Sequence, residues 1–406
     1  MMSARLLRTA LVLGFLSAIG PFAIDMYLPA LPTIAKDLHA SETAVQMSLM
    51  VFFLATALMQ LICGPFSDIY GRKLPLYLGL VLFGIGSIGS AMATGIEMLI
   101  FFRFVQGVGA SAGMVVPRAI VRDLYTGVDA ARLMSMLMLV FSISPILAPL
   151  TGSFIIEAFS WRGVFWAVLL AAIIGLGLLL FVQEETRPAE KRISGGVARA
   201  LRGYAFLMRD GKFIGMCCIG GFCVAAFFVY IANSSFIFIE TYGLTPREYS
   251  LVFSLNAISF FGVSQLSGML ASRFGLERVV SYAVSGYVVT MVLMVLTAIF
   301  LTQSLWVVMA FLFIGNGFLG LVLPGTSVLA LDDHGEIAGT AAALMGTLQL
   351  LVAAVAMGLS SLIMNGTVLP MLVSIAICGF GALVLTYVTI MRRGFSAPET
   401  RMTEIS

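Results

Sequence analysis

Long stretches without any charged residue constrain this chain more than any other feature. Six of them have the length of one helical membrane span each: 43–67, 74–96, 133–156, 163–183, 213–239 and 249–272. Two longer stretches, 279–331 and 337–391, fit two spans each, with polar breaks at 301–304 and 365–367. A helix needs about 20 apolar residues to cross the hydrocarbon of a bilayer. These stretches therefore predict ten transmembrane helices.

Two further apolar segments contain embedded charges. Residues 9–31 include Asp25, and residues 98–121 include Arg103. Only 11% of the residues are charged, against about 25% in soluble domains, which excludes a soluble enzyme or a secreted globular protein. The alternating pattern of an outer-membrane barrel is absent from the apolar segments. We therefore predict an all-α membrane protein with twelve transmembrane helices.

The distribution of lysine and arginine predicts the orientation of these helices. With the N-terminus in the cytoplasm, nineteen of these residues fall on the cytoplasmic side, and three, Lys36, Arg162 and Arg247, fall outside. Such a bias indicates that both termini are cytoplasmic. It also accounts for the net charge of +3, so we expect no nucleic-acid partner. The first apolar segment is too long for a signal peptide, and we interpret it as a retained helix.

The longest polar stretch, residues 184–212, divides the chain into two similar halves. We predict an N-terminal six-helix bundle over 1–183, a basic cytoplasmic linker with some interfacial helix over 184–212, a second bundle over 213–391 and a cytoplasmic tail over 392–406. The second span is followed by GPFSDIYGRK and the eighth by GMLASRFGLER. Gly64 and Gly268, like Gly71 and Gly275, are 204 residues apart. This repeat predicts two pseudo-symmetric bundles, each with a glycine-bracketed tight loop, and a binding site between them near the midplane.

Several motifs resemble those of a known family. Residues 64–73 resemble the signature loop of the major facilitator superfamily, and RFVQG at 103–107 resembles its helix-four motif. PILAPLTG at 145–152 resembles the helix-five motif of proton-coupled drug antiporters, through Pro145, Pro149 and Gly152. DMYLPALP at 25–32 and FSWR at 159–162 are similar to the bicyclomycin-resistance (Bcr/CflA) subfamily. The second-half loop departs from the first, with Ser272 in the place of Asp68.

The resemblance implies the fold and transport mode of that superfamily. We expect a proton-coupled multidrug efflux antiporter of the bacterial inner membrane that exports small, partly apolar antimicrobials by alternating access. It would work as a monomer in the lipid bilayer, with the proton gradient as its energy source and no cofactor or metal. We expect Asp68 to accept hydrogen bonds from a helix start, where the helix dipole favours an anion, and Arg72 to pair with Asp123. The resemblance implies that this group is a cytoplasmic latch that holds the outward-open state; solvated charges that only set the topology are the alternative. The predicted latch comprises Gly64, Asp68, Gly71, Arg72 and Asp123.

Asp25 and Arg103 are the sharpest candidates for chemistry. Each lies six residues from the predicted outer end of its helix, so both lie about 9 Å below the outer surface. Intramembrane charges are costly and are functional candidates by default. We predict that Asp25 takes up the coupled proton and that Arg103 is its fixed partner, because apolar burial disfavours the carboxylate and a nearby cation favours it. A static ion pair that only joins the two helices is the alternative.

Soft and aromatic side chains suit a cavity that accepts several apolar molecules. The predicted cavity residues are Met26, Tyr27, Gln106, Phe228, Tyr230, Asn233 and Asn256. Other functions stay open at this stage: a proton-coupled exporter or importer of one metabolite, a channel, or a membrane-embedded enzyme. The sequence contains no catalytic cluster, which weighs against an enzyme. The two-half repeat favours alternating access over a channel.

Overall fold

The computed structural model describes residues 4–188, 190, 192 and 196–393. Within these residues the secondary structure is entirely helical, and twelve helical segments are long and apolar enough to cross a membrane. This confirms the predicted fold class. The helices of the first half are α1 (Ala4–Asp25), η1 (Leu28–Ala30), α2 (Leu31–Asp37), α3 (Glu42–Tyr70), α4 (Lys73–Ala91), α5 (Ile96–Leu124), α6 (Gly127–Ala158) and α7 (Trp161–Phe181).

A short helix, α8 (Gly196–Leu207), connects the first half to the second. The helices of the second half are α9 (Gly211–Phe236), η3 (Ile237–Thr241), α10 (Pro246–Ser264), α11 (Ser267–Phe274), α12 (Leu276–Phe300), α13 (Leu305–Leu331), η4 (Asp332–Ile337), α14 (Ala338–Ile363), α15 (Val368–Thr389) and η5 (Met391–Arg393). The predicted polar breaks at 301–304 and 365–367 do separate α12 from α13 and α14 from α15.

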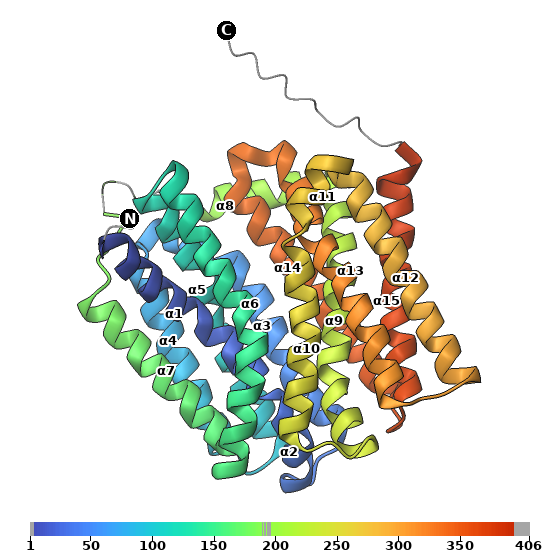
Figure 1. Cartoon of the computed structure of the whole chain (residues 1–406). Helices are drawn as coiled ribbons and strands as arrows, with labels where there is room; N and C mark the ends of the chain where they lie inside the picture. The colour runs from blue at the N-terminus through green and yellow to red at the C-terminus, as the bar shows by residue number, and fades with distance from the viewer. Residues whose placement is uncertain (1–3, 189, 191, 193–195, 394–406) are drawn as a thin grey trace.

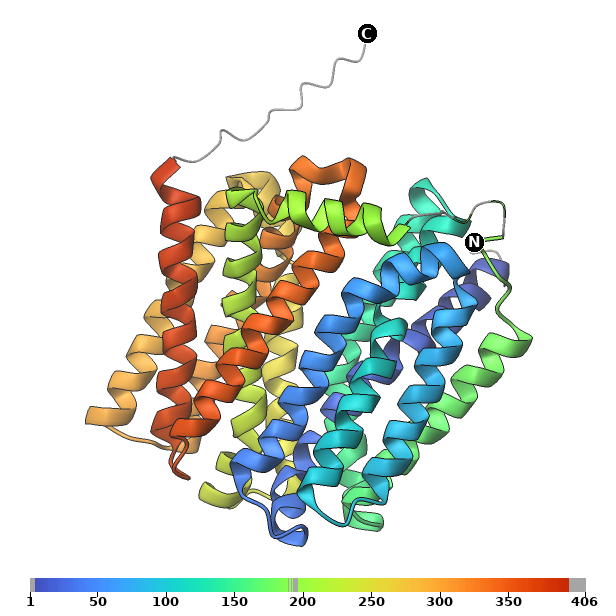
Figure 2. The ribbon, with the colours of Figure 1, turned by 180° about the vertical axis from the view of Figure 1, so that it is seen from behind.

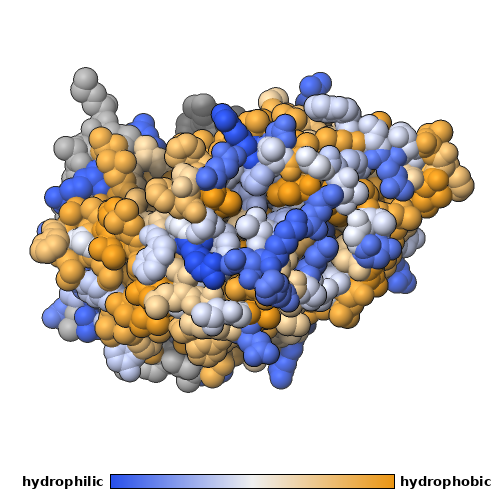
Figure 3. Space-filling model, turned by 90° about the horizontal axis from the view of Figure 1, so that it is seen from below, coloured by the Kyte–Doolittle hydropathy of each residue, from blue (hydrophilic) through white to orange (hydrophobic). Residues whose placement is uncertain are grey.

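The two halves stand side by side, and their spans run between the same two surfaces (Figure 1). We call the surface where α1 begins and α15 ends the termini side, and the opposite surface the far side. Seen from the far side, hydrophilic side chains occupy the middle of the molecule and hydrophobic ones much of its margin (Figure 3). Large apolar side chains such as Phe181 and Leu301 are 89% and 80% exposed. This is the surface expected of a protein whose sides face lipid.

Two seams join the halves: α3 packs against α14, and α6 packs against α10. In the first seam the Thr347 hydroxyl donates to the carbonyl of Ala57 at 2.9 Å. In the second, the Ser254 hydroxyl donates to the carbonyl of Ile146 at 2.7 Å, and Ser250 to that of Pro149 at 2.8 Å. The α6 helix is continuous through both of its internal prolines.

The first span differs from the expected single helix. α1 ends at Asp25, and the chain continues through η1 and α2 before it reaches the far side. Two prolines explain the break, since Pro29 and Pro32 have no N–H group to continue α-helical bonding. Asp25 is therefore the last residue of α1, at a helix end within the first span, and the regular helix stops directly after it.

The signature segment 64–73 is also more helical than predicted. α3 continues through Gly64 to Tyr70, so the turn consists of Gly71 and Arg72 alone. Gly71 has a φ of +95°, and Gly275 in the second copy has a φ of +85°. Residues with a side chain rarely adopt this conformation. The repeat is thus a repeat of helix, glycine turn and helix, in place of the expected glycine-bracketed loop.

Candidate functional site

Asp25 is a buried carboxylate with one hydrogen-bond donor. Its exposed fraction is 5%, and the Ser144 hydroxyl of α6 donates to Oδ2 at 3.1 Å. The backbone of Met26, directly after α1, packs against α6, since a Cβ on Gly152 of α6 would clash with the Met26 carbonyl oxygen. Gly152, from the helix-five motif, therefore lets α6 approach the break in α1 closely enough to present Ser144 to Asp25.

Arg103 is fully buried, with an exposed fraction of 0%. Nη1 donates to Oε1 of Gln106 at 2.6 Å and to the carbonyl of Ala23 at 3.4 Å. Its guanidinium carbon lies 4.5 Å from the ring centre of Tyr27 and 4.4 Å from that of Phe52. Ring faces attract a desolvated cation. Among the described residues, Nε and Nη2 have no hydrogen-bond acceptor.

The predicted partnership between these two charges stays a prediction, because each has other hydrogen-bond partners in this structure. Arg103 contacts Ala23 and Tyr27, which flank Asp25 in the chain, so the two residues do lie close along the first span. Yet no ion pair joins them in the described part of the chain. Aromatic faces and Gln106 hold the guanidinium instead. Asp25 consequently lies buried inside the protein with a neutral hydroxyl as its described partner, and the static ion-pair alternative is not what the structure contains.

The seven predicted cavity residues fall into three groups. Met26, Tyr27 and Gln106 belong to the first half: the Tyr27 hydroxyl pairs with Ser48 at 2.7 Å, and Gln106 donates to Ser87 at 2.8 Å. The other two groups involve the second half of the chain.

Tyr230 and Asn256 lie within the second half. The Asn316 amide donates to Oδ1 of Asn256 at 3.1 Å, and the Tyr230 ring stacks on Phe253 with centres 5.8 Å apart. The Tyr230 side chain is buried, with an exposed fraction of 2%. These neutral polar groups form the interior of the second bundle.

Phe228 and Asn233 face the other half directly. Gln46 of α3 donates to Oδ1 of Asn233 at 2.9 Å, and the ring centres of Phe53 and Phe228 are 4.1 Å apart. Nearer the far side, Lys36 and Glu240 form an ion pair of 3.1 Å between the halves. These contacts close the far side of the seam between the bundles.

The termini side, in contrast, contains cavities between the halves. One of about 490 Å³ lies among α3, α5, α8 and the start of α14. Another, of about 540 Å³, lies between α6 and α10 and is lined by Met138 and Ile258, among others. The seam is thus tighter at the far side than at the termini side.

The predicted latch residues form a connected charge cluster around a buried Arg72. Its side chain donates to Asp123 at 2.6 and 3.1 Å and to Asp68 at 2.8 Å. Asp68 also accepts from Arg187 at 2.9 Å. The expected bonds from a helix start to Asp68 are wrong, because its described partners are the two arginines. Gly64 lies within α3, where a Cβ would meet nothing within 4 Å, so it is not a site of close approach.

Sequence reasoning missed Glu185, which binds the same turn from the linker. Its carboxylate accepts from the backbone N–H groups of Arg72 at 2.9 Å and Lys73 at 3.1 Å, at the start of α4. Burial raises the pKa of Glu185, but hydrogen bonds from the backbone N–H groups of Arg187, Arg72 and Lys73 outweigh it and hold the pKa below its usual value. A Cβ on Gly71 would lie 2.7 Å from this carboxylate. The acidic pair 184–185 in a basic linker was the available signal.

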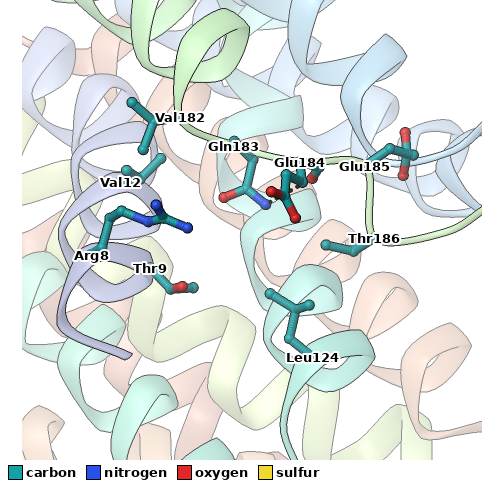
Figure 4. Close-up of a pocket in the computed structure, with 9 residues that line it drawn as sticks. All are labelled: Arg8, Thr9, Val12, Leu124, Val182, Gln183, Glu184, Glu185 and Thr186. Atoms are coloured by element: carbon teal, nitrogen blue, oxygen red, sulfur yellow. Dashed lines mark hydrogen bonds between the residues drawn. The ribbon is translucent and has the colours of Figure 1, made fainter. Parts of the chain in front are cut away.

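The two acidic residues of that pair point in different directions. Figure 4 shows Glu184 facing a small pocket with Arg8 and Leu124, and Glu185 turned away from it. The beginning of the linker is therefore fixed between α1 and the turn that precedes α4.

Comparisons with known proteins agree with this architecture. Residues 13–357 match the model of the Major Facilitator Superfamily. The chain is 34% identical over 352 residues to an uncharacterized MFS-type transporter, YdgK, of Bacillus subtilis, covering 86% of this chain and 87% of that protein. It is 30% identical over 374 residues to a bicyclomycin resistance protein homolog of Haemophilus influenzae, covering 91% and 92%.

A solved structure titled as a D-xylose-proton symporter superposes with a TM-score of 0.72 at 18% identity, covering 95% of this chain and 97% of the other. At that identity the likeness concerns the fold alone. The helical halves, the signature turn and the relatives together indicate a transporter and not an enzyme. The chain belongs to the major facilitator superfamily, in its bicyclomycin-resistance (Bcr/CflA) branch.

Proposed function

We propose that this transporter is a proton-coupled multidrug efflux antiporter. It exports small, partly apolar antimicrobials from the bacterial cytoplasm, with the termini side facing the cytoplasm, and it needs no cofactor besides the proton gradient. One observation carries the proposal: Asp25 is a buried carboxylate at a helix break within the membrane, with the Ser144 hydroxyl as its hydrogen-bond partner.

The chemistry of that site suits a proton carrier. A carboxylate without a paired cation is costly in the membrane interior, and protonation relieves this cost. Water or a positive charge that reaches the site would stabilise the deprotonated form again. Ser144 can donate to the charged form and accept from the protonated form, because a hydroxyl has both capacities. Asp25 can therefore take up a proton from one side of the membrane and release it to the other side when the access to the site changes.

The seam between the halves supports alternating access. Contacts such as Gln46–Asn233 and Lys36–Glu240 close the far side, while cavities remain on the termini side. Under the proposed orientation this is an inward-facing arrangement, from which drug would load. The Arg72 cluster is formed in it, which differs from the expected latch of the outward-open state. A rocking motion of one bundle against the other, with the far-side bonds exchanged for termini-side bonds, would then release it outside.

A drug-susceptibility panel on cells that express the protein tests this proposal. Bicyclomycin is the first probe, because a relative bears that name. We expect a several-fold rise in the inhibitory concentration of at least two unrelated drugs, and a return to the vector level when a protonophore is added. Resistance to none of the panel, or resistance unaffected by the protonophore, contradicts the proposal. Increased susceptibility would instead indicate an importer.

A further inference from the structure

The helix α8 crosses the α3–α14 seam on the termini side. It runs across the ends of these two helices and not along them (Figure 2). Its inward residues recur with helical spacing at Ala200, Gly203, Tyr204 and Leu207, and Leu207 is fully buried. A Cβ on Gly203 would lie 3.0 Å from the Thr340 side chain of α14. One face of α8 is thus fixed to both halves.

The attachment to the first half satisfies a specific backbone group. Pro65 has no N–H group, so the carbonyl of Leu61, four residues earlier in α3, lacks its helical donor. The Tyr204 hydroxyl donates to this carbonyl at 3.0 Å. An unsatisfied backbone carbonyl inside a membrane protein is costly, so this bond joins α8 to the part of α3 that leads into the latch.

The attachment to the second half is made through a histidine. The Phe206 ring lies edge-on to His334, with centres 6.1 Å apart. His334 is 8% exposed, and its Nε2 lies 2.9 Å from Oδ2 of Asp210. Asp210 in turn caps the start of α9 by accepting from the N–H groups of Lys212 and Phe213. The C-terminal half of α8 is therefore held to both halves of the chain by side-chain contacts.

The outward face of α8 combines an apolar stripe with a basic one. Leu201 is 61% exposed, and the exposed Ala205 lies on the same side of the helix. Met208, 53% exposed, and Arg209 follow α8 directly, in a turn whose N–H groups still bond back to Tyr204 and Phe206. At about 100° of rotation per residue, Arg202 and Arg209 lie about 40–120° around the helix axis from these three apolar residues. In water, such an apolar stripe would be unfavourable. At a membrane surface, an apolar stripe beside basic residues is the pattern of a helix that lies in the interface.

We propose that α8 is an interfacial helix that binds anionic phospholipid on the termini side. Leu201, Ala205 and Met208 enter the headgroup–acyl boundary, and Arg202 and Arg209 bind lipid phosphates. Charge complementarity selects anionic lipid over a neutral surface. Since α8 is bonded to both halves, anionic lipid that holds it in the interface also changes how easily the α3–α14 seam moves.

A nitroxide attached at Met208→Cys in the full-length protein, reconstituted in vesicles, measures where the helix lies. Four of the five native cysteines are buried, and the unmodified chain gives the background labelling. We expect collisions with oxygen, which concentrates in lipid, to exceed those with a water-soluble nickel complex. Labels at Leu293→Cys, on a lipid-facing side of α12, and Asp333→Cys, in the exposed η4 turn, are the lipid and water controls. Greater access to nickel, or protection from both reagents by a second copy or another protein, overturns the proposal.

The same label measures the lipid preference in vesicles of phosphatidylcholine with increasing phosphatidylglycerol. We expect insertion to increase with phosphatidylglycerol, and the amount required to rise about fivefold for each arginine replaced in Arg202→Gln and Arg209→Gln. Arg392→Gln, an exposed arginine on the same side, is the matched control and should behave as wild type. Insertion that ignores phosphatidylglycerol, or an equal effect of all three variants, contradicts the assignment of anionic lipid.

Tyr204→Phe tests the coupling to the seam. This variant removes only the hydroxyl that joins α8 to the Leu61 carbonyl. We expect insertion at position 208 to persist while the difference in transport rate between lipid compositions is lost. A lipid dependence of transport unchanged in Tyr204→Phe would show that α8 binds lipid without acting on the seam through this bond.

Discussion

The two halves share a fold but bury different chemistry. In the first half Asp25, Arg72 and Arg103 are buried. Among the side chains that the structure describes in the second half, no Asp, Glu, Lys or Arg is buried, and the interior polar groups are neutral, such as Asn256 and Asn316. A charge at the centre of a membrane costs about 2.5–3.5 kcal/mol on the translocon scale. Under the proposed function, a cost of this kind in one half only fits a first half that carries the coupling and a second half that mainly shapes the drug site.

The signature turns show the same division on a smaller scale. Gly71 and Gly275 share a positive φ, so both turns serve the fold. Around Gly71 are Asp68, Arg72 and Glu185, whereas Ser272, in the position of Asp68, donates to the carbonyl of Met269 within its own helix. Both turns have the same backbone geometry, but only the first has this set of charged neighbours. We infer that the geometry serves the fold and that the charges serve the mechanism.

Arg72→Gln should have the largest effect on stability. Removing one partner of a buried ion pair costs about 3–5 kcal/mol. Arg273→Gln, on the corresponding helix of the second half, should cost less than about 0.5 kcal/mol, as surface changes do. Thermal unfolding of the purified variants measures the difference. Equal losses in both would remove the contrast between the two turns.

Asp68→Asn should slow transport while the protein stays folded and inserted, because Arg72 keeps its two bonds to Asp123. Loss of a charge-assisted bond of about 1.5 kcal/mol corresponds to about tenfold in rate. Ser272→Ala, the control, should stay close to the wild-type rate. Initial rates of drug efflux at matched protein levels decide the point; wild-type turnover in Asp68→Asn would exclude the latch.

Asn233→Ala should change the relative resistance to different drugs. Its bond to Gln46 crosses the seam and is worth about 1 kcal/mol, or about fivefold. Tyr27→Phe should lower resistance to all drugs alike, since its hydroxyl binds Ser48 within the first half and its ring still covers Arg103. The drug panel measures both. Uniform loss in Asn233→Ala, or altered preference in Tyr27→Phe, would reverse the roles assigned to the halves.

Glu185→Gln should have the smallest effect, and one that depends on pH. The folded-state pKa of Glu185 lies below its unfolded value, so its contribution to stability is present above about pH 4.3 and is lost as the pH falls through the folded pKa. The melting temperature of wild type should exceed that of the variant at pH 7, and the two should converge under acid conditions. A constant difference at every pH would assign the effect to packing.

The sequence predicts some of these features far better than others. The spans and their breaks are local consequences of apolar length, so residues 301–304 and 365–367 were placed correctly. The partners of Arg103 and Glu185 were not, because they depend on which helix faces which. Equal depth in the membrane suggested that Arg103 would pair with Asp25, but depth does not specify rotation about the helix axis. Aromatic rings on three other segments took that place.

Drug-coupled proton movement in Asp25→Asn tests the central claim most directly. The purified protein is reconstituted in liposomes with an imposed pH gradient, and accumulation of a drug to which it confers resistance is followed together with proton flux. Asp129→Asn makes the same chemical change at an exposed residue and is the matched control. Wild type and Asp129→Asn should accumulate drug uphill with proton counterflow, and Asp25→Asn should do neither while still exchanging drug down its gradient. Uphill accumulation with proton counterflow at the wild-type rate in Asp25→Asn would contradict the assignment of Asp25 as the coupling residue.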